Sequence, residues 1–468
     1  MGKKILSKSL IVILVYLLFS VVFSLLENPT IYNNTLGRIS INYQHVGNVQ
    51  HYAIEKAKKP FVEINEGNAY NWDAAYYLKI RDESYGGVDP HYMDRYAFYP
   101  FFPMVWNISG IRSHHIVLFN FLLFGLALII LSQLFLKDKK SHMYFFILAL
   151  LLPSVIVFYL PYAESVFVLT LAIALVGLFK RSYFLYFIAM ICFSMTRPAV
   201  VILIFAFIGT DIVYLFRHRN FRHFLRQSLL TIAPVIIGWI TVTIMQYYYS
   251  DSWTTYFDTW DLWPKESGFL NKITDWSTEG FGMTSFSLFF LALPALIYAL
   301  VWSIASLFKK RDMQVTSLFS GNETFIKEYM FNVSILFIVG VIIYFVATSG
   351  NVLNGFFRYT IAVPFFYIIF FQLPEKLKNI SSRYIFGALI LFFTGLVLFM
   401  LKIVYAGDIW RFEYTGLFLF VLITPFILFE KYFTAKLKMV ILLIYILPAI
   451  IWHTYLFNMY LSNAWIFT

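Results

Sequence analysis

Long apolar runs separated by short polar segments fill most of the 468-residue chain. Runs of about 17–22 apolar residues are typical of helices that cross a lipid bilayer. The runs are continuous and do not alternate between apolar and polar positions, which argues against a membrane β-barrel. We therefore predict an all-α, polytopic membrane protein, a bundle of about 11–13 transmembrane helices within one membrane domain that covers residues 1–468.

About thirteen segments qualify as candidate spans by hydropathy. They are 8–26, 116–136, 143–160, 163–179, 183–195, 199–215, 229–249, 284–307, 330–348, 359–372, 384–404, 416–429 and 437–456. The first follows Lys3, Lys4 and Lys8 and lacks a small-residue cleavage site, so we expect it to remain as an anchor. Internal repeats and soluble domains are absent from the pattern.

Lysine and arginine are distributed unevenly among the loops. If the N-terminus is cytoplasmic, the short outer loops hold few cations beyond Arg197, Lys265, Lys272, Arg358 and Arg411. This distribution follows the positive-inside rule and predicts a multi-pass protein with a cytoplasmic N-terminus. The abundant Phe, Ile, Tyr, Asn and Lys are typical of an AT-rich genome and favour a bacterial plasma membrane. The net charge of +11 is then a signal of topology, and a nucleic-acid partner is not expected. The only partner that composition itself indicates is the lipid bilayer, because 60% of residues are hydrophobic and 13% charged.

Unusual polar residues gather in the first outer loop, 27–115, especially over 71–103. Asn71 is predicted to cap a short helix that begins at Trp72. Every fourth residue of this helix is apolar or aromatic: Trp72, Tyr76 and Ile80. Asp73 and Tyr77 share a neighbouring face. Such a helix is expected to lie among the lipid headgroups, with its aromatic side chains at the interface.

Four segments carry a recognisable pattern. They are WDAAYYLKI, continued by SYGG and AFYPFFP, in 72–103; PYAESVF at 161–167; TRPAV at 196–200; and FFRYTIAVP at 356–364. In their order along the chain and in the side of the membrane on which we expect them, these segments resemble the motifs of the second GPI mannosyltransferase (PIG-V) family and its prokaryotic relatives. The members of that family are GT-C type membrane glycosyltransferases. The resemblance implies a GT-C-like bundle and inverting transfer of mannose from dolichol-phosphate mannose. The chain departs from the family at 80–85, where IRDESY replaces I-A-x-x-G-Y.

Chemistry at an outer membrane surface leads to the same residues. Nucleotide sugars are absent there, so a sugar donor must arrive on a polyprenyl phosphate. Transfer needs a general base for the hydroxyl of an extracytoplasmic glycan, glycolipid or protein acceptor, and Asp73 is the candidate. Arg197 and Arg358, both beside span ends, would stabilise the departing phosphate. Glu164 opens a span on the same side, where a charge is costly unless it faces a cavity. We expect it to hold sugar hydroxyls, to orient an arginine, or to act as a second acid.

Further residues are candidates for contact with the sugar or the acceptor. These are Trp72, Tyr77, Asp94, Arg95 and Trp410. No cofactor and no metal site is indicated, because Cys192 lies in an apolar run and His114–His115 has no evident third ligand. A divalent ion bridged by Asp94 or His91 stays open as an alternative.

Each assignment has a structural alternative. Asp73 could cap a solvated helix, Glu164 and Arg197 could pair across a hairpin end, and Arg358 could be an interfacial anchor. Two other function classes also remain open: a lipid-linked glycan flippase or other transporter, and a non-catalytic partner that binds lipid-linked glycans. A transporter should carry ionisable groups near the middle of several spans. Here the charges lie at the outer ends, so we expect Asp73, Glu164 and Arg197 to converge on one outward-facing cavity.

Overall fold

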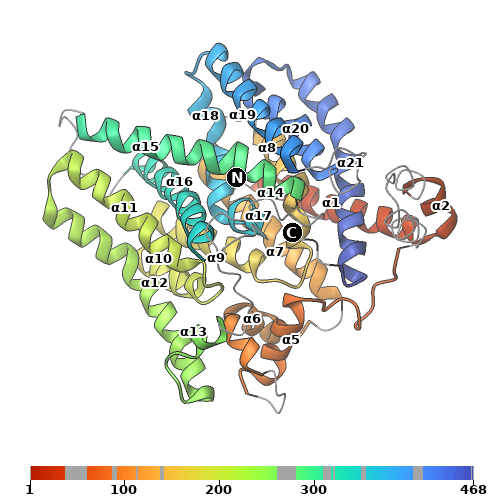
Figure 1. The fold of residues 1–468 in the computed structure, drawn as a ribbon, viewed down its shortest axis with the longest axis horizontal. Coiled ribbons are helices and arrows are strands. Elements are labelled where there is room, and N and C mark those ends of the chain that lie inside the picture. Colours follow the sequence, from red (N-terminus) through yellow and green to blue (C-terminus); the bar gives the residue numbers. More distant parts are fainter. Residues whose placement is uncertain are drawn as a thin grey trace.

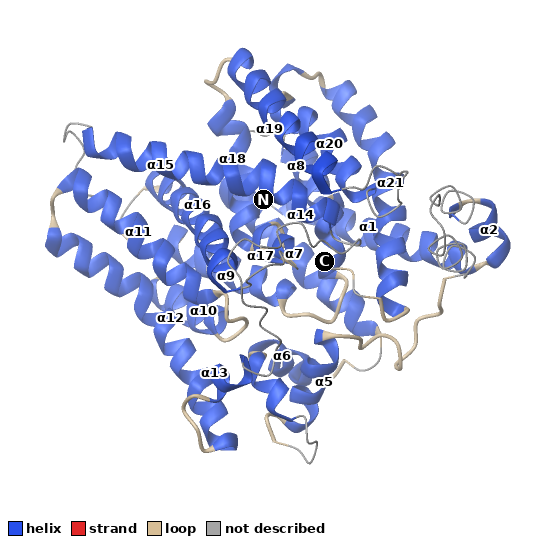
Figure 2. Cartoon of the chain, in the orientation of Figure 1, coloured by secondary structure: helices blue, strands red, loops and turns tan. Residues whose placement is uncertain are grey.

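The computed structural model describes residues 2–36, 61–86, 92–111, 114–136, 142–260, 281–308, 318–319, 322–348, 355–403, 415–464 and 466. Every regular element within these ranges is a helix, and none is a strand (Figure 1, Figure 2). The predicted class, an all-α polytopic membrane protein, is therefore confirmed. The core is continuous and consists mainly of aliphatic and phenylalanine side chains contributed by most of the helices.

Eight helical segments of the described chain are long and apolar enough to cross a membrane. They contain α1 (Gly2–Glu27), α7 (His115–Phe135), α11 (Val200–His218), α12 (Phe221–Ser250), the continuous run of α14 (Phe281–Ser287), η3 (Leu288–Ala292) and α15 (Leu293–Phe308), α16 (Glu323–Thr348), α19 (Ser382–Ile403) and α21 (Ala435–Leu461). Each coincides with a predicted span. In one part of the bundle, α12 packs on α10 (Tyr183–Ser194) and on α11, and α11 packs on α16 (Figure 1).

The remaining predicted spans form shorter helices. These are α8 (His142–Leu151) with η2 (Pro153–Phe158), α9 (Glu164–Phe179), α10 (Tyr183–Ser194), α17 (Phe356–Thr360) with α18 (Pro364–Leu377), and α20 (Thr415–Leu428). The expected span 143–160 is interrupted because Pro153 lacks the N–H that would continue α8 and forces Leu152 into an extended conformation. The helices α9 and α18 are buried on nearly all sides, which explains why their sequences are apolar all round.

The first long loop carries several short helices, as its length predicted. They are α2 (Pro29–Asn34), α5 (Asp73–Glu83), η1 (Tyr92–Ala97) and α6 (Phe101–Ser109). Helix α5 packs on α6 and η1, and α13 (Thr255–Trp260) packs on η1, so these elements gather at one end of the bundle (Figure 1). The backbone N–H of Phe101 donates to the carbonyl of Met195 at 3.1 Å, which attaches this group to the end of α10.

Helix α5 differs in detail from the prediction. It begins at Asp73, and Trp72 is the residue that precedes it, with a left-handed φ of 56°. Asn71 does not cap the helix, because its side-chain amide donates to carbonyl groups elsewhere. The buried face consists of Ala74, Tyr77 and Ile80, whereas Trp72 is 38% exposed. The predicted stripe of Trp72, Tyr76 and Ile80 is therefore wrong at Trp72, whose backbone conformation takes it off the helical face.

Candidate active site

Four charged side chains from distant parts of the sequence meet beside α5. Asp73 and Glu164 are the first residues of α5 and α9. Arg197 lies in the turn between α10 and α11, and Arg358 lies in α17. The structure thus brings together the residue nominated as the base, Asp73, the two nominated for donor binding, Arg197 and Arg358, and Glu164, which was nominated for sugar or acceptor binding. We call Asp73, Glu164, Arg197 and Arg358 the charged cluster.

Arg358 is the centre of the charged cluster. Its Nη2 donates to Asp73 Oδ2 at 2.9 Å and to Glu164 Oε1 at 2.7 Å. Its Nε donates to the same Glu164 oxygen at 2.9 Å. Arg197 Nη1 lies 3.2 Å from Glu164 Oε1 and forms an ion pair with it. One carboxylate oxygen of Glu164 is therefore shared between two guanidinium groups.

The members of the cluster differ in their exposure to solvent. The side chain of Glu164 is 1% exposed and that of Asp73 is 19% exposed. Two carboxylates and two guanidinium groups cancel in charge, which limits the cost of burying them. Arg358 is buried, so it is not the interfacial anchor considered as an alternative. Asp73 is the member of the cluster that solvent, or a substrate hydroxyl, can reach most easily.

Aromatic rings line the cluster. The guanidinium carbon of Arg358 lies 4.8 Å from the centre of the Tyr162 ring, and that of Arg197 lies 4.9 Å from the Tyr359 ring. Such cation–π contacts stabilise buried guanidinium groups. Sequence reasoning did not single out either tyrosine, although both lie within the segments PYAESVF and FFRYTIAVP. Their positions next to Glu164 and Arg358 in those segments were the available signal.

Two atoms of the cluster have unused hydrogen-bonding capacity. Glu164 Oε2 and Arg197 Nη1 are buried and have no hydrogen-bond partner among the described residues. The 3.2 Å contact of Arg197 with Glu164 is an ion pair that does not meet hydrogen-bond geometry. Buried polar atoms are nearly always satisfied in folded proteins, so an unsatisfied acceptor beside an unsatisfied donor is a feature expected of a ligand site.

Tyr77 adds a neutral donor beside these charges. Burial raises the pKa of the Tyr77 phenol well above its usual value, and the nearby Glu164 carboxylate raises it further. The phenol therefore keeps its proton at neutral pH and stays able to donate a hydrogen bond. Tyr77 lies on the buried face of α5, one helical turn after Asp73. Tyr77 and Asp73 therefore lie close together, as predicted, and the Tyr77 side chain is buried in the interior of the protein.

The other nominated residues lie apart from these contacts or outside the described chain. Arg95, in η1, donates from Nη1 to the Gly86 carbonyl at 2.6 Å and pairs with Glu83 at 2.8 Å. It joins η1 to the end of α5, while Asp94 is half-buried in the same element. Trp410 falls outside the described residues. Of this group, the structure gives a clear local role to Arg95 alone, and that role is to hold the loop.

No metal centre is formed by the described residues, in which no three His, Cys, Asp or Glu side chains are close enough to share an ion. His91 lies outside the described residues. The rings of His114 and His115 stack on each other with centres 4.6 Å apart. The alternative of an ion bridged by Asp94 or His91 therefore lies partly outside the described residues.

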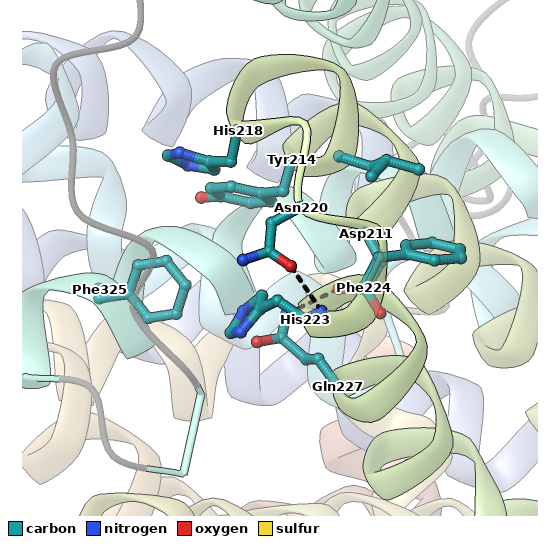
Figure 3. A pocket seen from close by; sticks show the side chains of 9 residues that line it. Asp211, Tyr214, His218, Asn220, His223, Phe224, Gln227 and Phe325 are labelled. Atoms are coloured by element: carbon teal, nitrogen blue, oxygen red, sulfur yellow. Dashed lines mark hydrogen bonds between the residues drawn. The ribbon is translucent and has the colours of Figure 1, made fainter.

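A second polar centre lies toward the other end of α11. Asp211 accepts hydrogen bonds from Gln227 at 2.7 Å, Ser228 at 2.7 Å and Tyr329 at 2.9 Å. Figure 3 shows the hollow beside it, lined among others by His218, His223 and aromatic side chains. All three donors are neutral and come from α12 and α16. The Asp211 carboxylate is thus satisfied, and it joins three membrane helices.

No protein-family model, curated protein or solved structure matches the chain. The assignment of the site therefore depends on the geometry of this chain's own residues.

Proposed function

We propose that the protein is a membrane glycosyltransferase that moves a hexose, with mannose as the expected sugar, from a polyprenyl-phosphate donor to an extracytoplasmic acceptor. The observation that carries this proposal is the charged cluster. It combines a partly exposed carboxylate, Asp73, with two buried guanidinium groups and a second carboxylate at the same end of the bundle. Transfer from a sugar phosphate needs a general base and, next to it, cations that bind the phosphate.

The geometry supports a division of roles. Asp73 is bound to Arg358 through Oδ2, which leaves Oδ1 to accept the proton of the acceptor hydroxyl. That hydroxyl oxygen attacks the anomeric carbon from the face opposite the phosphate, which inverts the configuration. The bond from the anomeric carbon to the phosphate oxygen breaks, and the phosphate leaves with the electron pair. Asp73 ends the step protonated, and the phosphate ends it with an added negative charge.

Arg197 is the better placed of the two arginines to bind that phosphate. Its Nη1 is buried without a hydrogen-bond partner among the described residues, whereas Arg358 makes three hydrogen bonds to the two acids. Charge-assisted hydrogen bonds from a guanidinium suit phosphate oxygens particularly well. The free Oε2 of Glu164 would accept from a sugar hydroxyl. The unused atoms of the cluster thus match the two polar parts of a sugar phosphate.

The outer location follows from the distribution of charge. Helix α9 runs from Glu164 in the cluster to Phe179, after which Lys180 and Arg181 follow. Helix α11 likewise runs from the cluster end to Arg217 and His218. The cations expected on the cytoplasmic side therefore lie at the opposite helix ends from the cluster. With the positive-inside rule, this supports an extracytoplasmic site.

The same arrangement argues against a transporter. A translocation path requires ionisable groups along the middle of several spans. The four charges of the cluster are instead at helix starts or in short connections between helices. This placement suits a substrate that reaches the site from the membrane surface.

The test is transfer of radiolabelled mannose from a synthetic polyprenyl-phosphate donor in membranes that contain the protein. We expect transfer by the native protein and a loss of about 100- to 10,000-fold with Asp73→Asn, the range for removing a general base. Asp82→Asn is the matched control, because Asp82 lies in the same helix and is 51% exposed. Native-level transfer by Asp73→Asn would remove the base assignment. Absence of transfer with mannose and with the other hexose donors would overturn the proposed activity.

A further inference from the structure

The end of the last helix is fastened to the segment that precedes Asp73. The Tyr460 hydroxyl, in the last turn of α21, accepts from the backbone N–H of Asn71 at 3.1 Å. Its single proton lies within reach of two acceptors, the Ala69 carbonyl at 2.9 Å and the Asn71 carbonyl at 3.1 Å. A single side-chain oxygen thus binds the backbone on both sides of residue 70.

Asn71 makes the reciprocal contacts. Its Nδ2 donates to the Tyr460 carbonyl at 2.7 Å and lies 3.4 Å from the Leu461 carbonyl. The last carbonyls of a helix have no partner within the helix, so they are ready acceptors for such a donor. Asn458 Oδ1 accepts from the N–H of Val62 at 2.8 Å, which extends the attachment along the segment. We call the paired contacts of Asn71 and Tyr460 the clamp.

The clamp is also connected to the charged cluster through Tyr162. The Tyr460 side chain is fully buried, and its ring meets the Tyr162 ring edge-on at 6.1 Å between centres. The guanidinium of Arg358 also contacts Tyr162, with its carbon 4.8 Å from the ring centre. Tyr460 therefore reaches Asp73 by two routes, one through the backbone at Asn71 and one through Tyr162 and Arg358.

The residue between the clamp and Asp73 is strained. Trp72 has φ 56° and ψ −129°, a conformation that is unfavourable for a residue with a side chain. Such a conformation costs about 1–3 kcal/mol and persists only where the surrounding structure imposes it. Here it is held between the clamp at Asn71 and the first turn of α5, which starts at Asp73. Release of the clamp would let Trp72 relax and would displace the start of α5.

We propose that Tyr460 is a positioning residue for Asp73, and that the clamp sets where the carboxylate stands relative to Arg358. This inference rests on the proposed function for its catalytic consequence, although the clamp itself can be measured independently. It predicts that an alteration at the C-terminal helix changes the rate of the chemical step and leaves donor binding intact. No pattern along the chain predicts this contact, because a single tyrosine 389 residues away supplies it.

The test is Tyr460→Phe, which removes the hydroxyl and keeps the ring on Tyr162. A displacement of a catalytic group by about 1 Å reduces rates by about 100-fold, so we expect kcat to fall by about 10- to 100-fold. The KM for the donor should stay unchanged, because Arg197 and Arg358 are untouched. A purely structural role would lower the amount of folded protein and leave the kcat of the folded fraction as it was.

Tyr445→Phe is the matched control. Tyr445 lies in the same helix and is equally buried, but its hydroxyl has no hydrogen-bond partner among the described residues. Its loss should leave kcat unchanged. Native kcat in Tyr460→Phe would overturn the proposal. Asn71→Ala removes the reciprocal donors and is expected to reproduce the fall in kcat, and it serves as the test variant if Tyr460→Phe does not fold.

Amide hydrogen exchange separates failure of the clamp from failure of the proposed function. Since the N–H of Asn71 donates to the Tyr460 hydroxyl, exchange over residues 69–74 should become faster in Tyr460→Phe and not in Tyr445→Phe. If the native protein transfers no sugar, this measurement still tests whether the clamp holds residues 69–74 in place. Faster exchange in Tyr460→Phe supports it, and exchange equal to that of the native protein overturns it.

Discussion

Arg358 and Asp73 are 285 residues apart in the sequence, yet Arg358 Nη2 lies 2.9 Å from Asp73 Oδ2. The same nitrogen lies 2.7 Å from Glu164 Oε1, so one NH2 group of the guanidinium links the two acids. A planar guanidinium can do this because its donors point in fixed, separate directions. The orientation of the proposed base therefore depends on an arginine that is itself held by a second, buried acid.

Replacement of Arg358 by lysine should separate charge from geometry. Lysine keeps the positive charge but cannot offer Nε and Nη2 to Glu164 and Asp73 together. We expect Arg358→Lys to fold and to lose about 100-fold or more in transfer rate, because orientation of the base is lost. Initial transfer rates and thermal unfolding in detergent measure the two effects. Arg358→Ala should in addition lose up to about 3–5 kcal/mol of stability, because Asp73 loses its ion pair with Arg358 and the buried Glu164 keeps only its ion pair with Arg197. Transfer by Arg358→Lys at the native rate would show that the guanidinium geometry is dispensable.

Removal of the Glu164 charge should strengthen phosphate binding. The cluster is neutral as it stands, and a polyprenyl-phosphate sugar brings one negative charge. Glu164→Gln leaves two guanidinium groups against one carboxylate, so we expect tighter binding of polyprenyl phosphate together with slower transfer. Binding of polyprenyl phosphate to purified protein in detergent gives the first quantity, and labelled-mannose transfer gives the second. Weaker phosphate binding in Glu164→Gln would mean that Glu164 serves chiefly to orient the arginines.

The helices and the charged cluster could be predicted from sequence because charged residues stand out at the ends of long apolar spans. Glu164, Arg197 and Arg358 were nominated since a charge at a span end is costly without a purpose. The role of Asn71 could not be found in this way. Its residue type fits a helix cap, but Tyr460, 389 residues distant, supplies partners for its side-chain amide. The left-handed Trp72 was equally hidden, because glycine or asparagine normally marks such a position.

Close packing of α10 on α12 should depend on Gly238. A Cβ at this position would lie 2.6 Å from the Ile191 carbonyl oxygen and 2.6 Å from Ser194 Cβ. Gly238→Ala should therefore separate the helices at a cost of about 1–3 kcal/mol, measured as a lower unfolding midpoint in detergent. Gly387→Ala is the control, since nothing lies within 4 Å of a Cβ there, and alanine favours the helix. Equal midpoints for the two variants would contradict the close approach of α10 and α12.

Two substitutions of Asp211 separate a structural role from participation in transport. Asp211→Leu leaves the donors of Gln227, Ser228 and Tyr329 without an acceptor, at about 1–3 kcal/mol for each orphaned group. Asp211→Asn should cost less, because its amide oxygen accepts two hydrogen bonds and the Ser228 hydroxyl can turn to accept from its amide nitrogen. Thermal unfolding in detergent should rank native, Asp211→Asn and Asp211→Leu in descending stability, with equal transfer per folded molecule. If Asp211→Asn instead abolished function in folded protein, the charge itself would be required. That outcome would favour the transporter, because a membrane-embedded carboxylate remote from the cluster would then be part of the mechanism.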